Sequence, residues 1–108
     1  MRVLLDECCP SPLASCLKDA EVYTVERAGL KGVKNGALVM AAEGAFSVVI
    51  TADKNLRYQQ DLRARKIAIV ELPFNSWKRL RTLVPVIQAA IASIKPGQYL
   101  EIPSSPGE

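Results

Sequence analysis

The sequence contains no histidine among its 108 residues. A Ser-His-Asp triad, a Cys-His dyad and a histidine-ligated zinc site are therefore excluded. Any hydrolytic chemistry must use carboxylates, lysine, or a water molecule bound to a metal ion. No apolar run reaches the roughly 18 residues that a membrane span needs, and the N-terminus does not have the pattern of a signal peptide. We therefore expect a cytoplasmic protein with no membrane association.

Cysteine is scarce and poorly spaced for disulfide or metal chemistry. Cys8, Cys9 and Cys16 form an odd set without a C-x-x-C pair. We expect them to be reduced, partly buried residues that fill the structure. The alternative is a thiolate nucleophile at a helix start, where the helix dipole lowers the pKa of a thiol, although no histidine is present as its base.

Charge is unevenly distributed along the chain, whose net charge is +3. Residues 1–53 carry five basic and seven acidic side chains, whereas residues 54–108 carry nine basic and four acidic ones. Eight of those nine basic residues lie between Lys54 and Arg81. This pattern suits a protein that binds a metal ion in one place and phosphates beside it, and the simpler alternative is a solvated basic face.

Apolar runs bounded by turn residues predict strands that alternate with helices along the whole chain. The strands are expected at residues 3–5, 22–25, 48–51, 67–72 and 99–102. The helices are expected at residues 12–18 after Ser11, at 37–43 after Asn35, and from 77 to 94 with a break at Pro85. The polar stretch 54–65 is expected to form a turn and a short helix.

This alternation predicts an α/β fold with three layers, in which a mostly parallel sheet of four or five strands lies between helices. Residues 1–102 are expected to form a single domain, and residues 103–108 a flexible tail.

Two aspartates, Asp6 and Asp53, follow the first and third predicted strands. In an open parallel sheet, ligands bind outside the carboxyl ends of the strands, at the point where the strand order reverses. Converging carboxylates repel unless a cation lies between them, and Mg²⁺ is satisfied by one or two carboxylates plus water. We therefore predict a catalytic metal site at these two residues, and expect either Asp→Asn change to leave stability intact or improved. The alternative is that each aspartate only caps the following turn.

Five further residues are expected to support this site, and one of them is Asn35, which precedes the second predicted helix. Glu7 adjoins Asp6, and Lys54 and Asn55 directly follow Asp53, where they could contact a phosphate or a metal-bound water or simply form a turn. Glu43 lies late on the second predicted helix, where it could face either the strand ends or solvent.

The segment that follows Asp53 has a composition typical of single-stranded RNA binding. Arg57, Tyr58, Gln59 and Gln60 combine a guanidinium, an aromatic ring and amides, which suit base stacking and hydrogen bonds to base edges. Packing of Tyr58 against the domain is the alternative.

Several short motifs together resemble the small PIN-like domain family related to VapC toxins. They are Asp6-Glu7 after an apolar strand, Asn35-Gly36 at a helix start, Thr51-Ala52-Asp53, Asn55-Leu56, Tyr58-Gln59-Gln60, Leu72-Pro73 and Asn75-Ser76-Trp77. The resemblance covers nearly the whole chain, with the Thr-x-Asp and strand-end Asp-Glu motifs as its most specific parts.

The resemblance implies a PIN-like fold, Mg²⁺- or Mn²⁺-dependent RNA cleavage, and the role of toxin in a toxin–antitoxin pair, with a cognate antitoxin as protein partner. Asp6 and Asp53 match the first and a later metal-binding acid of the family. Where related domains carry an acid at the start of the second helix, this chain has Asn35. Glu43 or Glu7 is the candidate substitute; with neither, the domain binds RNA or a partner without cutting.

Two alternatives to a nuclease remain open from the sequence. One is a receiver-like Mg²⁺-binding domain in which Asp53 accepts a phosphoryl group, although the fourth predicted strand ends in Val70-Glu71 and not in a hydroxyl residue. The other is a non-catalytic module that binds RNA or an antitoxin. A homodimer is plausible in each case.

Overall fold

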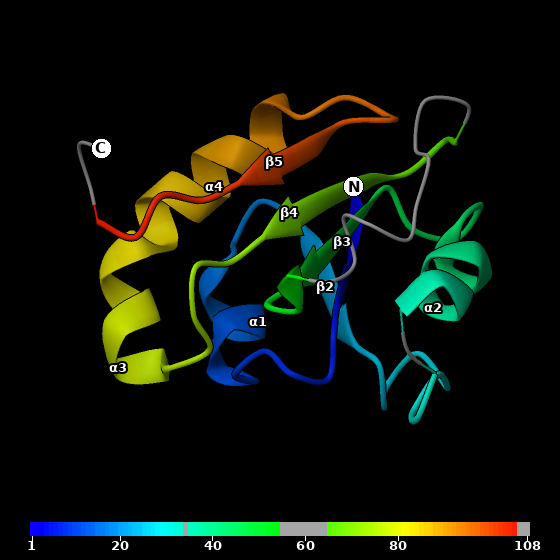
Figure 1. Cartoon of the computed structure of the whole chain (residues 1–108), viewed down its shortest axis with the longest axis horizontal. Coiled ribbons are helices and arrows are strands. Elements are labelled where there is room, and N and C mark those ends of the chain that lie inside the picture. Colours follow the sequence, from blue (N-terminus) through cyan, green and yellow to red (C-terminus); the bar gives the residue numbers. More distant parts are fainter. Residues whose placement is uncertain (34, 55–64, 106–108) are drawn as a thin grey trace.

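Five strands form a single sheet at the centre of the molecule (Figure 1). The structure is a computed structural model, and it describes residues 1–33, 35–54 and 65–105. The strands run in the spatial order β2-β1-β3-β4-β5, and every neighbouring pair is parallel. They are β1 (Arg2–Leu5), β2 (Glu21–Thr24), β3 (Val48–Thr51), β4 (Ala68–Glu71) and β5 (Tyr99–Glu101). The sheet is therefore wholly parallel.

Helices connect these strands and cover both faces of the sheet. They are α1 (Pro12–Cys16), α2 (Asn35–Ala42), α3 (Trp77–Leu80), the 3₁₀ helix η2 (Arg81–Leu83) and α4 (Val84–Ser93). In Figure 1, α2 lies on the opposite side of the sheet from α1 and α4. None of the helices in the described part of the chain has the length and apolar composition that a membrane span requires.

Alternate residues of the central strands point into two separate cores, as the period of a strand requires. Leu5 and Ile50 pack on one face with Leu13 of α1, Leu80 of α3 and Ile87 of α4, among other residues. On the other face, Leu4 and Val49 pack against Leu38 and Val39 of α2. The structure therefore confirms the predicted α/β fold of three layers.

The predicted element boundaries agree with the structure to within a few residues. The strand at 48–51 has the predicted limits. The break predicted at Pro85 is confirmed. η2 ends at Leu83, and the separate helix α4 begins at Val84. The first helix is shorter than expected: it ends at Cys16 because Leu17 leaves the helical region, with φ −93° and ψ 83°. Asn35 is the first residue of α2 and not the residue before it.

The strand order reverses between β1 and β3, which are neighbours although β2 and α2 separate them in sequence. Leu5 pairs with Ile50, so the two strands end at the same level. The backbone N–H of Asp6 extends the ladder by one residue, donating to the carbonyl oxygen of Ile50 at 2.9 Å. The carboxyl ends of β1 and β3 therefore form the switch point at which such sheets bind ligands.

The core beneath α3 offers a test of the packing. Leu80 is completely buried against the sheet, so Leu80→Ala should lower the free energy of unfolding by about 3 kcal/mol in urea denaturation, through lost burial and a residual cavity. Met40 is 61% exposed, and Met40→Ala should change it by less than about 0.5 kcal/mol. Equal effects of the two substitutions would contradict the packing described.

Candidate functional site at the carboxyl ends of β1 and β3

Asp6 is a nearly buried carboxylate immediately after β1, with 9% of its surface exposed. The backbone N–H of Glu7 donates to Oδ1 at 2.7 Å, and the hydroxyl of Thr51 donates to Oδ2 at 2.8 Å. The thiol of Cys8 also faces Oδ2, at 3.6 Å. A carboxylate with two oxygens has about four acceptor positions, so three donors leave room for one further ligand.

Thr51 joins the two strand ends through a single oxygen atom. Its side chain is fully buried at the end of β3. While Oγ1 donates to the carboxylate of Asp6, it accepts a hydrogen bond from the backbone N–H of Asp53 at 3.0 Å. The carboxylate of Asp6 and the backbone of Asp53 are therefore held around one hydroxyl, which brings together the two residues that the sequence predicted as the site.

Glu71 is a third polar residue at this edge of the sheet, and it is not among the site residues predicted from the sequence. It pairs with Thr51 across β3 and β4, so the two side chains lie on the same face. Asp6, Thr51 and Glu71 are the buried polar or charged side chains of the described residues. The hydroxyl of Tyr99 donates to Oε1 of Glu71 at 2.7 Å, and Nζ of Lys54 lies 3.7 Å from Oε2.

A signal for Glu71 was present in the sequence. An acid follows the apolar run Ala68–Val70, just as Asp6 follows Val3–Leu5. The apolar residue Leu72 comes next, however, so the predicted strand continued to residue 72 and put Glu71 inside it. The structure ends β4 at Glu71.

Cys8 lies in the site and is exposed, unlike the partly buried filler that the sequence predicted. Its sulfur accepts from the backbone N–H of Ala52 at 3.4 Å and lies 3.8 Å from Oγ1 of Thr51. The hydrogen bond from Cys9 is the main cause that lowers the pKa of Cys8 from 9.0 to about 7, against an opposing effect of burial. The same contact, followed by burial, raises the pKa of Cys9.

The donor set fits a hydrated metal ion and not a closed metal cage. Among the described residues, no group of three or more His, Cys, Asp or Glu side chains is placed to hold a metal ion. Mg²⁺ commonly retains several waters and is held by one or two carboxylates. Asp6 and Asp53 are the residues that would hold such an ion.

Apart from Glu43, the remaining predicted site residues divide into two groups. Glu7 and Lys54 lie beside Asp6 and Asp53, and both are exposed. Asn55, Arg57, Tyr58, Gln59 and Gln60 lie outside the described residues, as do the side chain of Asn35 and most of the predicted 54–65 element.

Glu43 lies at the opposite edge of the sheet, so the structure does not bring it to Asp6. It follows α2 and precedes β3, where its Oε1 accepts from Nη1 of Arg65 at 3.1 Å and its Oε2 from the backbone N–H of Lys66 at 2.8 Å. The hydrogen bond from Lys66, and then that from Arg65, lowers the pKa of Glu43. The reason is the direction of the chain: a helix that enters a parallel strand ends at the amino edge of the sheet, away from the strand carboxyl ends.

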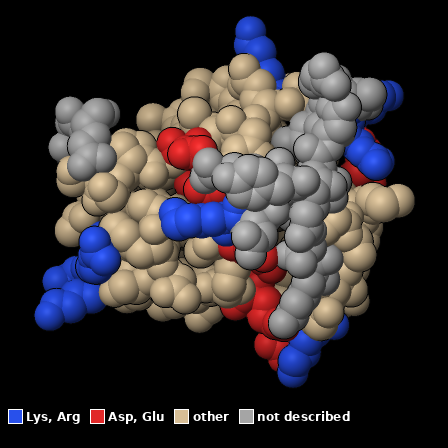
Figure 2. Space-filling view, viewed as in Figure 1, with Lys and Arg blue, Asp and Glu red and all other residues tan. Residues whose placement is uncertain are grey.

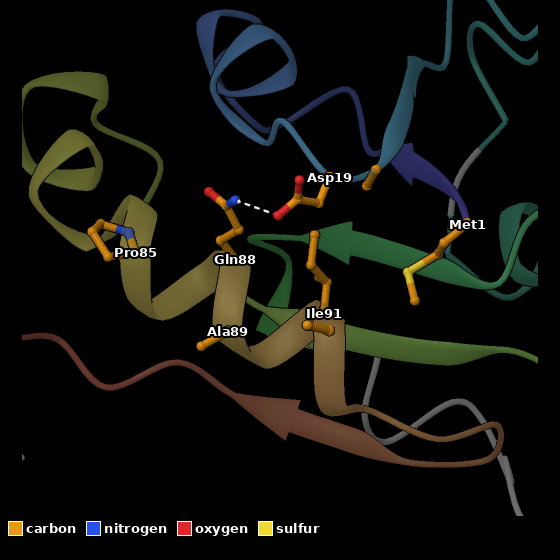
Figure 3. Close-up of a pocket in the computed structure, with 8 residues that line it drawn as sticks. Met1, Asp19, Pro85, Gln88, Ala89 and Ile91 are labelled. Carbon is orange, nitrogen blue, oxygen red and sulfur yellow. Dashed lines mark hydrogen bonds between the residues drawn. The ribbon is translucent and has the colours of Figure 1, made fainter.

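Two of the cavities that the described residues line differ in place and in character. One of about 230 Å³ opens beside Asp6 and is also lined by Glu7, Glu26 and Lys31. The other, of about 490 Å³, lies between α4 and the turn before β2 (Figure 3). Its walls are mainly apolar, and Gln88 donates to Asp19 at 3.2 Å within it. Of these two cavities, the first is the one that adjoins Asp6.

The structure changes the expected stability of one substitution. Asp6 faces three hydrogen-bond donors, so loss of a carboxylate outweighs any relief of repulsion. We expect Asp6→Asn to lower the free energy of unfolding by about 1 kcal/mol, since the amide NH₂ cannot accept from those donors.

The hydroxyl of Thr51 can be tested by an isosteric change. Thr51→Val removes a donor to Asp6 and an acceptor for Asp53, so it should cost about 2 kcal/mol in chemical denaturation. Thr82 is exposed and donates only to the carbonyl of Arg79, so Thr82→Val serves as the matched control and should cost about 0.5 kcal/mol or less. Similar values for both would show that the Thr51 hydroxyl does not join the strand ends.

Cys8 should be the thiol that reacts at neutral pH. Because its pKa is lowered to about 7, its alkylation by iodoacetamide should reach half of its maximal rate near pH 7, whereas buried Cys9 stays protected. A thiol with a lowered pKa also adds stability that is fully present above pH 9.0 and is lost as the pH falls through about 7. Cys8→Ser should abolish both effects, and a wild-type alkylation midpoint near pH 9 would contradict them.

Comparisons of this chain with protein-family models, with curated proteins and with solved structures find no match. The side chains around Asp6 and Thr51 are therefore the main ground for a function. They establish a polar site at the switch point of a five-stranded parallel sheet.

Proposed function

We propose that this protein is a metal-dependent ribonuclease of the PIN-like type. The observation that carries the proposal is the hydroxyl of Thr51, which donates to the carboxylate of Asp6 and accepts from the backbone of Asp53. This contact gathers two acidic residues at the edge where parallel sheets bind ligands. The resemblance of the Asp-Glu and Thr-x-Asp motifs to PIN-like domains supports the same assignment.

The residues of the site have separate roles in this proposal. A Mg²⁺ or Mn²⁺ ion held by Asp6 and Asp53 would supply an activated water and neutralise charge on the phosphodiester. Thr51 and the backbone N–H of Glu7 orient the carboxylate of Asp6. A carboxylate that is already oriented loses less side-chain entropy when it binds.

Basic side chains near the site suit an anionic substrate that extends beyond it, such as a polynucleotide. Figure 2 shows acidic and basic side chains next to one another near the middle of one face, with further basic side chains toward its rim. Lys54 directly follows Asp53, and it is exposed. A basic group beside acidic residues suits the pairing of a phosphate with a metal ion.

The proposed biological role is that of a cytoplasmic toxin that cleaves RNA and is inhibited by a cognate antitoxin. It rests on the resemblance to the VapC-related family. A homodimer is compatible with it.

A receiver-like domain is the second candidate, because the order β2-β1-β3-β4-β5 is also that of the receiver protein CheY. Asp53 would then accept a phosphoryl group beside Asp6 and Glu7. Two features disfavour this reading: β4 ends in Glu71, and residues 102–105, which follow β5, contain no lysine. Labelling with acetyl phosphate that is lost in Asp53→Asn would favour the receiver over the nuclease.

Cleavage of a single-stranded RNA with Mn²⁺ tests the nuclease directly. We expect Asp53→Asn and Asp6→Asn each to lower the cleavage rate by at least about 100-fold, because each removes a charged metal ligand. Asp19 is an exposed acid in the distant 490 Å³ cavity, so Asp19→Asn should retain the wild-type rate.

Circular dichroism and thermal unfolding should show that the Asp6→Asn and Asp53→Asn variants remain folded. Cleavage that survives Asp53→Asn would remove the proposed mechanism. RNA binding without cleavage by the wild type would favour the non-catalytic module.

A further inference from the structure

We propose that Lys54 is the phosphate-binding residue of this site and that Glu71 positions it. The inference rests on the proposed function, since it assumes that the site takes a phosphodiester or phosphate anion. Lys54 and Glu71 would then add a binding position and a positioning residue to the two proposed metal ligands, Asp6 and Asp53.

Glu71 is a charged group in an unusually buried place. Its side chain is 3% exposed, and it lies at the last position of β4 between β3 and β5. A buried carboxylate is costly unless hydrogen bonds or an opposite charge compensate for lost hydration. Tyr99 supplies such a hydrogen bond at 2.7 Å, and Lys54 supplies the opposite charge at 3.7 Å.

Lys54 forms the exposed half of this ion pair. Its side chain is 59% exposed, so the ammonium lies at the surface while its partner carboxylate lies beneath. An ammonium has three donor hydrogens, and the contact with Glu71 leaves some of them for a ligand. An exposed lysine held by a buried carboxylate is a pre-organised cation, which loses less entropy when it binds an anion.

Tyr99 connects this pair to the core. It is partly buried and packs against the core beneath α2 while its hydroxyl donates to Glu71. The position of Glu71 is thus determined by β4 on one side and by a core aromatic residue on the other. Because Glu71 is fixed, its ion pair restrains the ammonium of Lys54.

The ion pair with Glu71 places the ammonium of Lys54 next to a proposed metal ligand, because Lys54 follows Asp53 in the chain. The backbone of Asp53 is bound by Thr51. Thr51 and Glu71 are paired neighbours on the sheet. Thr51 therefore holds the backbone of Asp53, and its neighbour Glu71 holds the ammonium of Lys54. A metal ion and a phosphate would then be bound side by side.

Glu71 is not itself a proposed metal ligand. Thr51 separates it from Asp6 across the sheet, and no three acidic, cysteine or histidine groups of the described residues converge to hold an ion. Its pairing with a lysine identifies it as a positioning residue.

A double-mutant cycle on RNA binding and cleavage tests this inference. The variants are Lys54→Met, Glu71→Gln and the double mutant, with a short labelled single-stranded RNA as the probe. Binding is measured by fluorescence anisotropy in EDTA over a range of salt concentrations, and cleavage is measured with Mn²⁺ at saturating RNA. Thermal unfolding verifies that each variant is folded.

Lys54→Met should weaken RNA binding about fivefold and reduce the slope of log K against log salt by about 0.7, the value for one phosphate contact on a single strand. Glu71→Gln should lower the cleavage rate about tenfold without weakening binding to the same extent, since Lys54 keeps its charge but loses its position. In the Lys54→Met background, Glu71→Gln should have little further effect on cleavage.

Tyr99→Phe is the milder companion variant, because it removes the hydroxyl donor and keeps the charge of Glu71. It should lower cleavage about threefold in the wild-type background and not in Lys54→Met. It keeps the inference testable if Glu71→Gln does not fold.

The outcomes separate this inference from the proposed function. If Lys54→Met leaves both the affinity and the salt slope unchanged, Lys54 does not bind phosphate, even in an active nuclease. If the effects of Lys54→Met and Glu71→Gln simply add, Glu71 is structural and does not position Lys54.

If the wild type binds RNA without cleaving it, the nuclease proposal fails and the binding cycle decides the inference. The effect of Glu71→Gln on affinity should then differ at least threefold between the two backgrounds. If the wild type does not bind RNA at all, the inference is overturned together with the nuclease.

Discussion

The hydrogen bonds of the Thr51 hydroxyl are the interaction on which the rest of the site depends. At one buried position a side chain must donate to a carboxylate and accept from a backbone N–H. A hydroxyl does both with one atom, whereas an ionised carboxylate can only accept and an aliphatic side chain can do neither. Threonine is also β-branched, which suits the last position of a central strand. Local strand preference and site chemistry thus favour the same residue.

The two buried carboxylates at this edge are stabilised in different ways. Asp6 is surrounded by neutral donors, namely a backbone N–H, a hydroxyl and a thiol. Glu71 is paired with a lysine and a phenol. Among the described residues, no lysine or arginine forms an ion pair with Asp6, whereas Lys54 forms one with Glu71. In the proposed function, this difference favours Asp6 as the ligand of a cation from solution and Glu71 as a residue with a fixed place in the protein.

The fold could be predicted from the sequence more completely than the site. Apolar runs such as Val48–Ile50 and the proline at position 85 indicated elements that the structure confirms. The strand order could not be predicted, because it depends on which strands pair and not on any local pattern. The contribution of Glu71 was hidden by the apolar residue that follows it. The lowered pKa of Cys8 arises first from the hydrogen bond from Cys9, and then in part from contacts with Ala52 and Thr51, which lie more than 40 positions away along the chain and could not be predicted from it.

The backbone ladder between β1 and β3 has a consequence for how the sequence can change. The N–H of Asp6 is bonded to the carbonyl of Ile50, so the pairing of the two strands decides which side chain meets Thr51. Because side chains alternate between the faces of a strand, a deletion of one residue within Arg2–Leu5 would turn Asp6 toward the helices of the other layer. Insertions between β2 and α2 leave this pairing intact. Natural variation in length should therefore accumulate in the connections, while the spacing from the start of β1 to its aspartate stays constant.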